Sequence, residues 1–374
     1  MTAELVPLDP DSDNTPAVQR AAKALAEGAL VVFPTETVYG LAANAAIADS
    51  VRRIRDIKGR EASKPFTVHI SQAEQCEEFV PEIGVMGRRF MRKAWPGPLT
   101  LIFKVEDPAS VPAYRRMSEA GAEAVYAEHS VGLRFPDHRV AELLLRGAGV
   151  PVIASSANVG GAEAPCEADR IQAELGEKVD TILDGGATRY HKSSTVVAVN
   201  GQGYKMIRAG VWDERTVQRM ATVNILFVCS GNTCRSPIAE GLCKQMLAQR
   251  LGCSVAELAK RGIIVQSAGT LGISGGRGSD ASIEVCKRRG IDISDHTPQG
   301  LSAELIHLAD YIYVMARHHL DTVCSISPGD ARKARMLDPQ GDIADPIGGA
   351  TEDYEAVAQR ISKVLEERLN EVTL

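Results

Sequence analysis

The chain has 374 residues, of which 44% are hydrophobic and 24% are charged, and its formal net charge is −6. This length supports two domains of ordinary size. The negative net charge argues against a protein that binds nucleic acid through its overall charge, although it allows a local basic groove. No apolar run reaches the roughly 18 residues that span a bilayer, and the acidic, polar residues 1–13 are not expected to be a signal peptide. The eight cysteines include no C-x-x-C pair, so we expect no zinc ribbon, no disulfide framework and a reducing, cytoplasmic location.

The first half of the chain predicts a twisted mixed α/β sheet, because strands and helices follow one another without strict alternation. A helix is expected to begin at Thr15, as its N-cap, and to end at Gly28. Asp49 is expected to cap a second helix, and Ser71 with Glu74 has the pattern of a capping box for a third. Strands are predicted over 29–33, 66–70, 99–105, 131–135, 150–154, 194–199 and 205–208.

Three clusters of polar side chains lie on loops and strand ends of this half. Cations on one loop and hydroxyl or amide donors on the others suit a polyphosphate beside a pocket for a small amino acid or nucleoside. Each cluster alone is more often a solvated loop than a site. The clusters are Lys58, Arg60 and Lys64; Ser155, Ser156 and Asn158; and Thr35, Thr37 and His69.

Several motifs of this half resemble those of the threonylcarbamoyl-AMP synthase family, in the same order, from about residue 10 to about residue 212. The motifs are Pro34-Thr35-Glu36-Thr37-Val38-Tyr39-Gly40-Leu41, Lys58-x-Arg60, Trp95-Pro96-Gly97-Pro98, Arg134 before Pro136-Asp137-His138, and Ser156-x-Asn158. The resemblance implies an enzyme that condenses L-threonine, bicarbonate and ATP into threonylcarbamoyl-AMP and pyrophosphate for tRNA modification. It also implies magnesium with the ATP and, as partners, the downstream tRNA threonylcarbamoyl-transfer machinery and a possible contact with tRNA itself.

The same resemblance assigns expected roles to individual side chains. Cations for the leaving pyrophosphate and exclusion of water are what an easily hydrolysed acyl-phosphate intermediate needs. No magnesium-binding carboxylate stands out, and the stretch over 106–130 is longer than the family usually carries there, which we interpret as a candidate lid. The residues implied for ATP are Lys58, Arg60, Ser156, Asn158, Ser194 and Arg208, and those implied for threonine are Thr35, His69 and Arg134.

Two other interpretations of the first half stay open, and in both only the second half would be catalytic. The first is an RNA-binding module that uses Lys58, Arg60 and the pair Arg115-Arg116. The second is a carbamoyl-transfer module of the hydrogenase-maturation type, against which the lack of zinc-finger cysteine pairs and of an acylphosphatase pattern counts.

The second half alternates strands and helices more regularly than the first. We predict a first domain over 1–212, a polar linker over 213–222 and a second domain over 223–374. The pattern indicates a doubly wound parallel sheet, whose ligand site lies outside the carboxyl ends of its strands. Strands are expected over 223–228, 263–267 and 311–315, and helices over 237–250, 279–289, 301–308, 317–324 and 353–371.

The first strand of this half leads into a loop that is suited to hold a phosphate. Backbone N–H groups at a helix N-terminus bind anions, and Arg235 can clamp phosphate oxygens in a bidentate fork. Cys229 is placed to be a thiolate that attacks phosphorus and forms a phosphocysteine, with Ser236 donating a hydrogen bond to its sulfur. The loop consists of Cys229, Ser230, Gly231, Asn232, Thr233, Cys234, Arg235 and Ser236.

The leaving group requires a general acid, and two Asp-Pro pairs are candidates. Asp345 opens Asp345-Pro346-Ile347-Gly348-Gly349, a loop just ahead of the last helix, and we predict that it is the acid. Asp338 is predicted to be a turn residue. Cys234 is either a packed thiol or a resolving cysteine that could form a reversible disulfide with the nucleophile.

This half resembles the low-molecular-weight protein-tyrosine phosphatases along its length of about 150 residues, most of all the bacterial protein-arginine phosphatase branch. The shared motifs are residues 228–237, Ser267-Ala268-Gly269-Thr270 and Gly341-Asp342-Ile343-Ala344-Asp345-Pro346. Thr233 stands where tyrosine-directed members usually have an aliphatic residue, and Ile347 where they carry an aromatic ring. The resemblance implies a cofactor-free protein phosphatase for phosphoarginine, with phosphotyrosine and then a small phosphorylated metabolite as alternatives.

Overall fold

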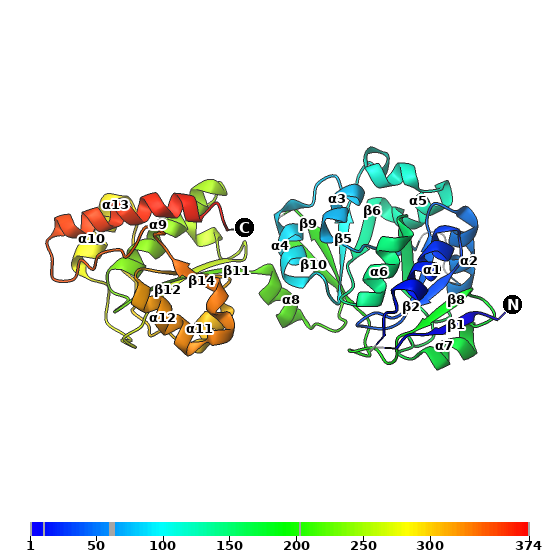
Figure 1. Cartoon of the computed structure of the whole chain (residues 1–374). Coiled ribbons are helices and arrows are strands. Elements are labelled where there is room, and N and C mark those ends of the chain that lie inside the picture. Colours follow the sequence, from blue (N-terminus) through cyan, green and yellow to red (C-terminus); the bar gives the residue numbers. More distant parts are fainter. Residues whose placement is uncertain (1, 10–11, 60–63, 202, 373–374) are drawn as a thin grey trace. The chain divides into compact units, whose positions relative to one another are not determined.

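A computed structural model describes residues 2–9, 12–59, 64–201 and 203–372. The chain divides into two compact units, residues 1–221 and 222–374, which are described separately below (Figure 1). Among the described residues, no helix is both long enough and apolar enough to cross a membrane. Arg60, one of the expected phosphate-binding cations, lies outside the described residues.

The first unit is built on a mixed sheet, which confirms the predicted fold class. Its described strands pair in the order β1-β8-β2-β3-β7-β4-β6-β5-β9-β10. Both parallel pairs, such as β4 with β6, and antiparallel pairs, such as β3 with β7, occur. The strands are β1 (Glu4–Pro7), β2 (Val31–Phe33), β3 (Gly40–Asn44), β4 (Thr67–His69), β5 (Leu99–Lys104), β6 (Ser130–Arg134), β7 (Val152–Ser156), β8 (Thr181–Asp184), β9 (Thr195–Asn200) and β10 (Gly203–Arg208).

Helices cover both faces of this sheet because alternate strand residues are apolar on each face. One core joins α1 and α6 to strand residues such as Phe33 and Ala154, and the other joins α2, α4 and α8 to residues such as Leu101 and Leu133. The helices are α1 (Thr15–Ala26), α2 (Ala48–Lys58), α3 (Cys76–Phe79), α4 (Gly84–Ala94), α5 (Glu119–Val125), α6 (Arg139–Ala148), α7 (Ala168–Leu175) and α8 (Glu214–Ala221).

Three expected helix caps are wrong in detail. The N-cap of α1 is Asn14 rather than Thr15, which is the first helical residue. The N-cap of α2 is Ile47, and Asp49 lies in the first turn of that helix. At the third predicted helix, the capping side chain is that of Gln75 and not that of Glu74. Its Oε1 accepts hydrogen bonds from the backbone N–H groups of Ser71 and Gln72.

The stretch over 106–130, interpreted above as a candidate lid, contains regular structure that packs on the rest of the unit. It contains α5, whose N-cap Ser118 accepts a hydrogen bond from the N–H of Gly121. A side chain at Gly121 would collide with the carbonyl oxygen of Ala45, so the absence of a Cβ lets the helix lie directly on the end of β3. Ala124 and Val125 are buried in the core, and the carbonyl of Ala124 accepts the N–H of Phe66. A segment packed in this way belongs to the body of the unit.

The second unit confirms the predicted doubly wound parallel sheet. Its described strands lie in the order β12-β11-β13-β14, and all of their pairings are parallel. One face packs on α9, α10 and α13, and the other on α11 and α12 (Figure 1). The elements are β11 (Val223–Cys229), α9 (Arg235–Arg250), β12 (Ile263–Gly269), α10 (Asp280–Arg288), α11 (Ala303–Leu308), β13 (Tyr311–Val314), α12 (Arg317–Ile326), β14 (Ala334–Met336) and α13 (Thr351–Arg368).

Two candidate active sites

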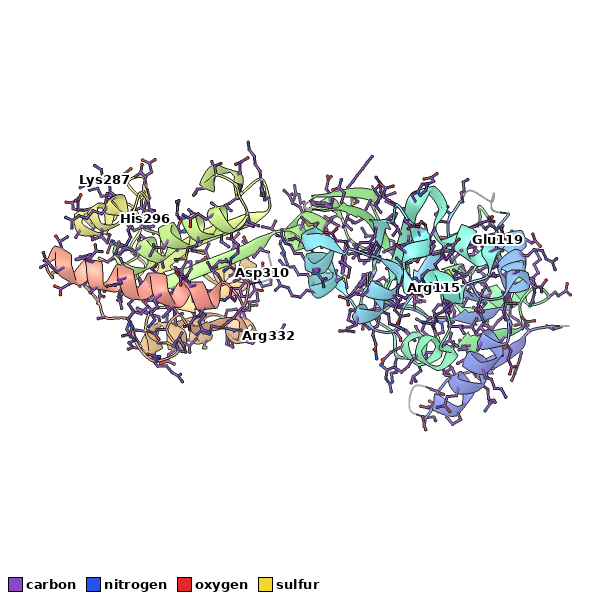
Figure 2. All side chains as sticks on the ribbon, turned by 90° about the horizontal axis from the view of Figure 1, so that it is seen from above. Arg115, Glu119, Lys287, His296, Asp310 and Arg332 are labelled. Carbon is purple, nitrogen blue, oxygen red and sulfur yellow. The ribbon has the colours of Figure 1, made fainter. Side chains whose placement is uncertain are left out.

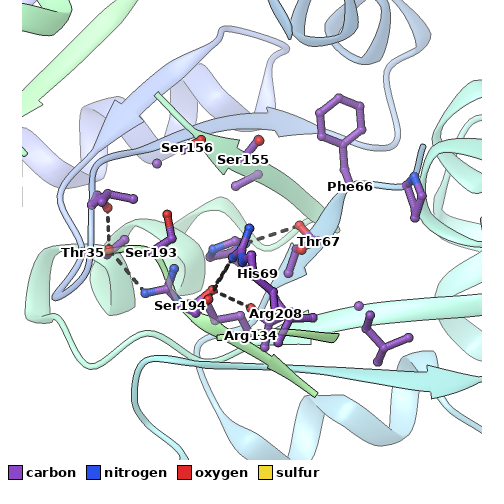
Figure 3. Close-up of a pocket in the computed structure, with 18 of the residues that line it drawn as sticks. Thr35, Phe66, Thr67, His69, Arg134, Ser155, Ser156, Ser193, Ser194 and Arg208 are labelled. Carbon is purple, nitrogen blue, oxygen red and sulfur yellow. Dashed lines mark hydrogen bonds between the residues drawn. The ribbon is translucent and has the colours of Figure 1, made fainter. Parts of the chain in front are cut away.

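A cavity of about 220 Å³ opens over the sheet of the first unit (Figure 3). Strand pairing explains why residues far apart in sequence meet there. His69 of β4 pairs with Arg134 of β6, and Arg134 pairs in turn with Thr100 of β5. Of the residues predicted from the sequence, the cavity is lined by Thr35, His69, Arg134, Ser156, Ser194 and Arg208.

Arg134 is held by a buried set of acceptors at one side of the cavity. Its Nη2 donates to Thr37 Oγ1 at 2.6 Å, to Glu36 Oε1 at 3.0 Å and to Thr35 Oγ1 at 3.4 Å. The side chain of Glu36 is 1% exposed and that of Arg134 is 7% exposed, so this ion pair is shielded from water. A buried charge without its partner is costly, and each of the two therefore fixes the other.

His69 presents a neutral ring to the same cavity. Burial, and then the charge of Arg134, lower the pKa of His69 to about 3. The ring packs edge-on against Phe33, with centroids 6.0 Å apart, and its Nδ1 lies 3.3 Å from the carbonyl oxygen of Thr67. At neutral pH this side chain can therefore give or accept a hydrogen bond, but it adds no charge.

Arg208 supplies the second cation of the cavity. Its Nη2 donates to the carbonyl oxygen of Ser194 at 2.9 Å, and Ser194 Oγ lies 3.0 Å from Thr100 Oγ1. Burial, followed by the charge of Arg134, lowers the pKa of Arg208. Two arginines that face one small cavity create a positive potential, which favours an anionic ligand.

A neighbouring cavity of about 480 Å³ contains Lys58, Lys64 and Asn158 and shares Ser155 and Ser156 with the first. Lys58 is buried, and its Nζ donates to the carbonyl oxygen of Ser156 and to Asn158 Oδ1, both at 2.9 Å. Except for Arg60, which lies outside the described residues, the predicted cations and donors therefore lie in two adjoining cavities.

Sequence reasoning missed part of this site. Thr67 lines the first cavity and could have been found, because it stands two residues before His69 and so on the same face of β4. Tyr39 belongs to the motif over 34–41 quoted above but was given no role, and Thr100 and Ser193 had no signal of their own in the sequence. Among the described residues, no group of three or more His, Cys, Asp or Glu side chains could hold a metal ion. Magnesium that enters with ATP takes most of its ligands from phosphate oxygens and water, so it does not require such a group.

In the second unit, β11 ends at Cys229 and α9 begins at Arg235, so the five residues between them form a tight loop. Asn232 adopts φ 56°, a left-handed conformation that Asn tolerates better than most residues. The thiol of Cys229 is buried, accepts the N–H of Asn232 at 3.3 Å and lies 3.0 Å from Ser236 Oγ. Hydrogen bonds of this kind, at a helix N-terminus, stabilise a thiolate.

The side chain of Asn232 holds the loop to its surroundings. Its Nδ2 donates to Ser236 Oγ at 2.9 Å and to Ser267 Oγ at 2.8 Å, and its Oδ1 accepts the N–H of Gln299. His296, labelled in Figure 2, places its Nε2 at 2.9 Å from the carbonyl oxygen of Asn232. These partners were not predicted from the sequence, although Ser267 belongs to one of the motifs noted above.

Arg235 and Asp345 meet beside this loop. Arg235 is buried, its Nη1 donates to the carbonyl oxygen of Ile343 at 3.0 Å, and its Nη2 donates to Ser230 Oγ at 3.2 Å and also pairs with Asp345. Its Nε is buried and has no hydrogen-bond partner among the described residues. That N–H points to a missing acceptor, as expected of an arginine that receives an anion.

The other aspartate candidate has a structural role. Asp338 is buried, accepts the Nε–H of Arg360 on α13 at 2.6 Å and caps the N–H of Gln340. Asp345, in contrast, is 37% exposed and contacts Arg235. Of the two, only Asp345 lies at the loop.

Three further residues around the loop are placed as follows. Cys234 is buried, with its Sγ 3.6 Å from Ser279 Oγ and 3.5 Å from the hydroxyl of Tyr354, and both Cys229 and Cys234 are free thiols. Thr233 is partly exposed, with its hydroxyl 3.5 Å from the sulfur of Cys234. His319, which sequence reasoning missed, lies with its Nε2 2.9 Å from Ser230 Oγ, and burial lowers its pKa to about 3.

The second unit is a parallel α/β domain with a buried cysteine in the tight loop between its first strand and the next helix, and known families match both units. Residues 224–373 match the family described as low molecular weight phosphotyrosine protein phosphatase. Residues 23–210, just over half of the chain, match the family described as telomere recombination (Sua5/YciO/YrdC). The chain belongs to this family through its first unit and carries a phosphatase-family domain as its second.

Individual relatives agree with the first match. The chain is 37% identical over 199 residues to a threonylcarbamoyl-AMP synthase of Bacillus subtilis, covering 53% of this chain and 55% of that protein. It is 30% identical over 173 residues to a threonylcarbamoyl-AMP synthase of Thiobacillus denitrificans, covering 46% of this chain and 86% of the relative. The structure of Sua5 of P. abyssi complexed with L-threonine has the same fold, with a TM-score of 0.51, 22% identity and coverage of 72% and 92%. The chain thus spans about half the length of the Bacillus protein.

Proposed function

We propose that the first unit is a threonylcarbamoyl-AMP synthase. The observation that carries this proposal is the convergence of Thr35, His69 and Arg134 with Ser156, Ser194 and Arg208 on one electropositive cavity. Relatives bear this name over the same residues, and one related structure contains L-threonine.

The reaction uses the cavities in two steps. The amine nitrogen of threonine attacks the carbon of bicarbonate, which loses water and leaves an N-carboxylate. A carboxylate oxygen then attacks the α-phosphorus of ATP, and the bond from that phosphorus to the bridging oxygen breaks to release pyrophosphate. Arg134 holds the threonine carboxylate, while Lys58, Ser156, Asn158, Ser194 and Arg208 bind the phosphates. Neutral His69 contacts the amino acid without adding a charge that would repel its ammonium form.

The test is a direct assay of product. The full chain is incubated with L-threonine, bicarbonate, magnesium and ATP, and threonylcarbamoyl-AMP and pyrophosphate are measured with and without each component. Formation of both, dependent on threonine and bicarbonate, supports the proposal. Binding of tRNA without any pyrophosphate release would instead favour an RNA-binding module. Against that module stands the burial of Lys58, whose ammonium donates to the carbonyl oxygen of Ser156, whereas Arg115 is exposed (Figure 2).

For the second unit we propose a protein phosphatase that works through a phosphocysteine. The Cys229 thiolate attacks phosphorus, Asp345 donates its proton to the leaving group, and the phosphoryl group is transferred to sulfur. Water then attacks the phosphorus, its proton goes back to Asp345, and the bond between phosphorus and sulfur breaks to regenerate the thiolate. Arg235 neutralises the phosphoryl oxygens in both steps, and the N–H groups of the loop bind them.

We favour phosphoarginine as the substrate, with phosphotyrosine as the alternative. Thr233 offers a hydroxyl within the loop, which can meet the polar N–P linkage, and Ile347 provides no aromatic surface on which a phosphotyrosine ring could stack. The test is a side-by-side measurement of kcat/KM on phosphoarginine and phosphotyrosine versions of the same peptide. A higher value for phosphotyrosine would reverse the assignment.

A further inference from the structure

Three aliphatic side chains, Leu271, Ile273 and Ile347, lie exposed around the phosphate loop and are called the aliphatic rim below. Their exposed fractions are 68%, 46% and 70%, the highest among the large hydrophobic residues described in the second unit. Exposed apolar side chains that gather at one place mark a surface that another molecule covers.

Backbone hydrogen bonds fix the first part of the rim to the phosphate loop. The N–H of Leu271 donates to the carbonyl oxygen of Ser230 at 3.0 Å. Farther along the same segment, the N–H of Ser279 donates to the carbonyl oxygen of Thr233 at 2.9 Å. Between them, the N–H of Gly275 donates to the carbonyl oxygen of Pro298. Because the segment is tied at these points, its aliphatic side chains face solvent on a supported backbone.

The rim reaches two sides of the loop. Ile273 lies over Gly231, since a Cβ at that glycine would be 3.9 Å from Ile273 Cδ1. Ile347 comes from the segment of the proposed acid, where its N–H donates to Asp345 Oδ1 at 3.3 Å. In the sheet, β12 lies on one side of β11 and β13 lies on the other. The segment that carries Asp345 is attached on the β13 side, because the N–H of Ile343 donates to the carbonyl oxygen of Met315, the residue after β13. A molecule that covers the whole rim must therefore extend beyond the phosphorylated group in two directions.

We propose that the aliphatic rim binds a phosphorylated polypeptide segment that carries apolar side chains next to its phosphorylated residue. This inference rests on the proposed phosphatase activity of the second unit. Sugars and nucleotides carry hydroxyl groups and charges close to their phosphate, and these cannot be satisfied by aliphatic side chains. A polypeptide extends on both sides of its modified residue and can place one apolar side chain on Leu271 and Ile273 and another on Ile347.

The test compares two phosphopeptides of equal length and charge, one with leucine and one with serine on each side of the phosphorylated residue. Each is made with phosphoarginine and with phosphotyrosine, and kcat/KM is measured for the full chain. Burial of one aliphatic side chain corresponds to about a tenfold gain, so we expect the leucine peptide to be preferred at least about tenfold. Ile347→Ser and the double variant Leu271→Ser/Ile273→Ser should each reduce this preference. Leu308→Ser, which removes an exposed aliphatic side chain from α11, should keep it.

Three outcomes would overturn the inference. Equal kcat/KM values for the two peptides, with robust turnover, would remove the rim as a recognition surface and leave the phosphatase proposal standing. Self-association of the wild-type chain that Ile347→Ser abolishes would show that a second copy covers the rim. Absence of turnover on all four peptides and on a small phosphorylated metabolite would remove the phosphatase proposal itself, and the inference with it.

Discussion

The two candidate sites hold anions in different ways. In the second unit eight consecutive residues, Cys229 to Ser236, contain the proposed nucleophile, the loop N–H groups and the arginine. In the first unit the lining residues extend from Thr35 to Arg208 and meet only because the strands of a mixed sheet pair as they do. Both sites contain buried residues, but the groups of the contiguous site come from one loop, whereas those of the dispersed site come from several strands and loops of the sheet.

The largest expected effect tests the contiguous site. Cys229→Ser removes the thiolate and should lower phosphatase turnover by more than about 10³-fold, because a serine hydroxyl in that place stays protonated. The replacement is nearly isosteric, so the unfolding temperature should change little, and synthesis of threonylcarbamoyl-AMP by the first unit should stay intact. Phosphate release from a phosphopeptide and pyrophosphate release are measured on the same preparation. Turnover at the wild-type rate would contradict the phosphocysteine mechanism.

The second largest expected effect is on kcat, and it distinguishes Asp345 from Asp338 as the general acid. Asp345→Ala should reduce kcat about 10²-fold to 10³-fold, as expected for loss of a general acid. The reduction should be smaller for p-nitrophenyl phosphate, since a good leaving group needs less protonation. Rapid-quench measurements of the phosphocysteine would show its formation slowed.

Asp338→Ala is the matched control for this prediction. It removes a buried partner of Arg360 and should lower the free energy of unfolding by about 1–3 kcal/mol, because polar groups are left unpaired. Its kcat should remain near the wild-type value. The reverse result, a stable but inactive Asp338→Ala and an active Asp345→Ala, would exchange the two assignments.

A third effect tests the dispersed site. Arg134→Ala should lower threonylcarbamoyl-AMP formation about 10²-fold, because a buried charge-assisted contact to an anionic ligand contributes about 3 kcal/mol. The same change leaves the carboxylate of Glu36 buried without its partner, so it should also destabilise the first unit by about 3–5 kcal/mol. Product formation and thermal unfolding are measured together.

Arg189→Ala is the control, because its ion pair with Asp137 is exposed. Such a pair contributes about 0–1 kcal/mol, so neither measurement should move much. Loss of activity in Arg134→Ala at unchanged stability would show that Glu36 does not depend on Arg134, and the contrast between the two kinds of site would weaken.

The same contrast explains what could be predicted from the sequence. A strand, a glycine-containing loop and a helix start are local signals, so the loop at Cys229 and the parallel sheet around it follow from a short window. The pairing of His69 with Arg134 is not local and was not predicted; the family resemblance implied only that both residues line the threonine site. Strand β1 was missed because a short edge strand with exposed residues has little hydrophobic pattern. The helix α5 was missed because it is short and its buried residues are mostly alanine and glycine, which give little hydrophobic pattern.

A smaller effect tests how Thr233 sharpens the contiguous site. Thr233→Ile replaces a hydroxyl by an aliphatic group and should shift the ratio of kcat/KM values toward phosphotyrosine by about tenfold, the size of one hydrogen bond to a polar linkage. Thr233→Ser keeps the hydroxyl and serves as the control, with little change expected in the ratio. If both variants keep the wild-type ratio, the hydroxyl does not select the substrate and the preference for phosphoarginine loses its main support.

The smallest expected effect is on the pH dependence of the free energy of unfolding, and it concerns a buried histidine that both sites contain. Each contains a buried histidine, His69 or His319, whose pKa is lowered to about 3. In the unfolded chain a histidine binds a proton below about pH 6.5, so between that pH and about 3 the unfolded state takes up protons that the folded state does not. The free energy of unfolding should therefore fall as the pH is lowered, by about 1 kcal/mol per histidine between pH 7 and 5.5.

Replacing one of these histidines should remove its share of this pH dependence from its own unit. His319→Asn keeps a hydrogen-bonding group near Ser230 and should make the unfolding of the second unit less sensitive to pH, while that of the first unit keeps its slope. His307→Asn is the control, because that ring is 59% exposed, whereas His318 lies against His319 and its charge helps to lower the pKa of His319. Calorimetric scans from pH 7 to 5.5 measure the slopes. A slope that persists unchanged in His319→Asn would mean that other groups control acid unfolding of the second unit, and the two sites would then differ in this property as well.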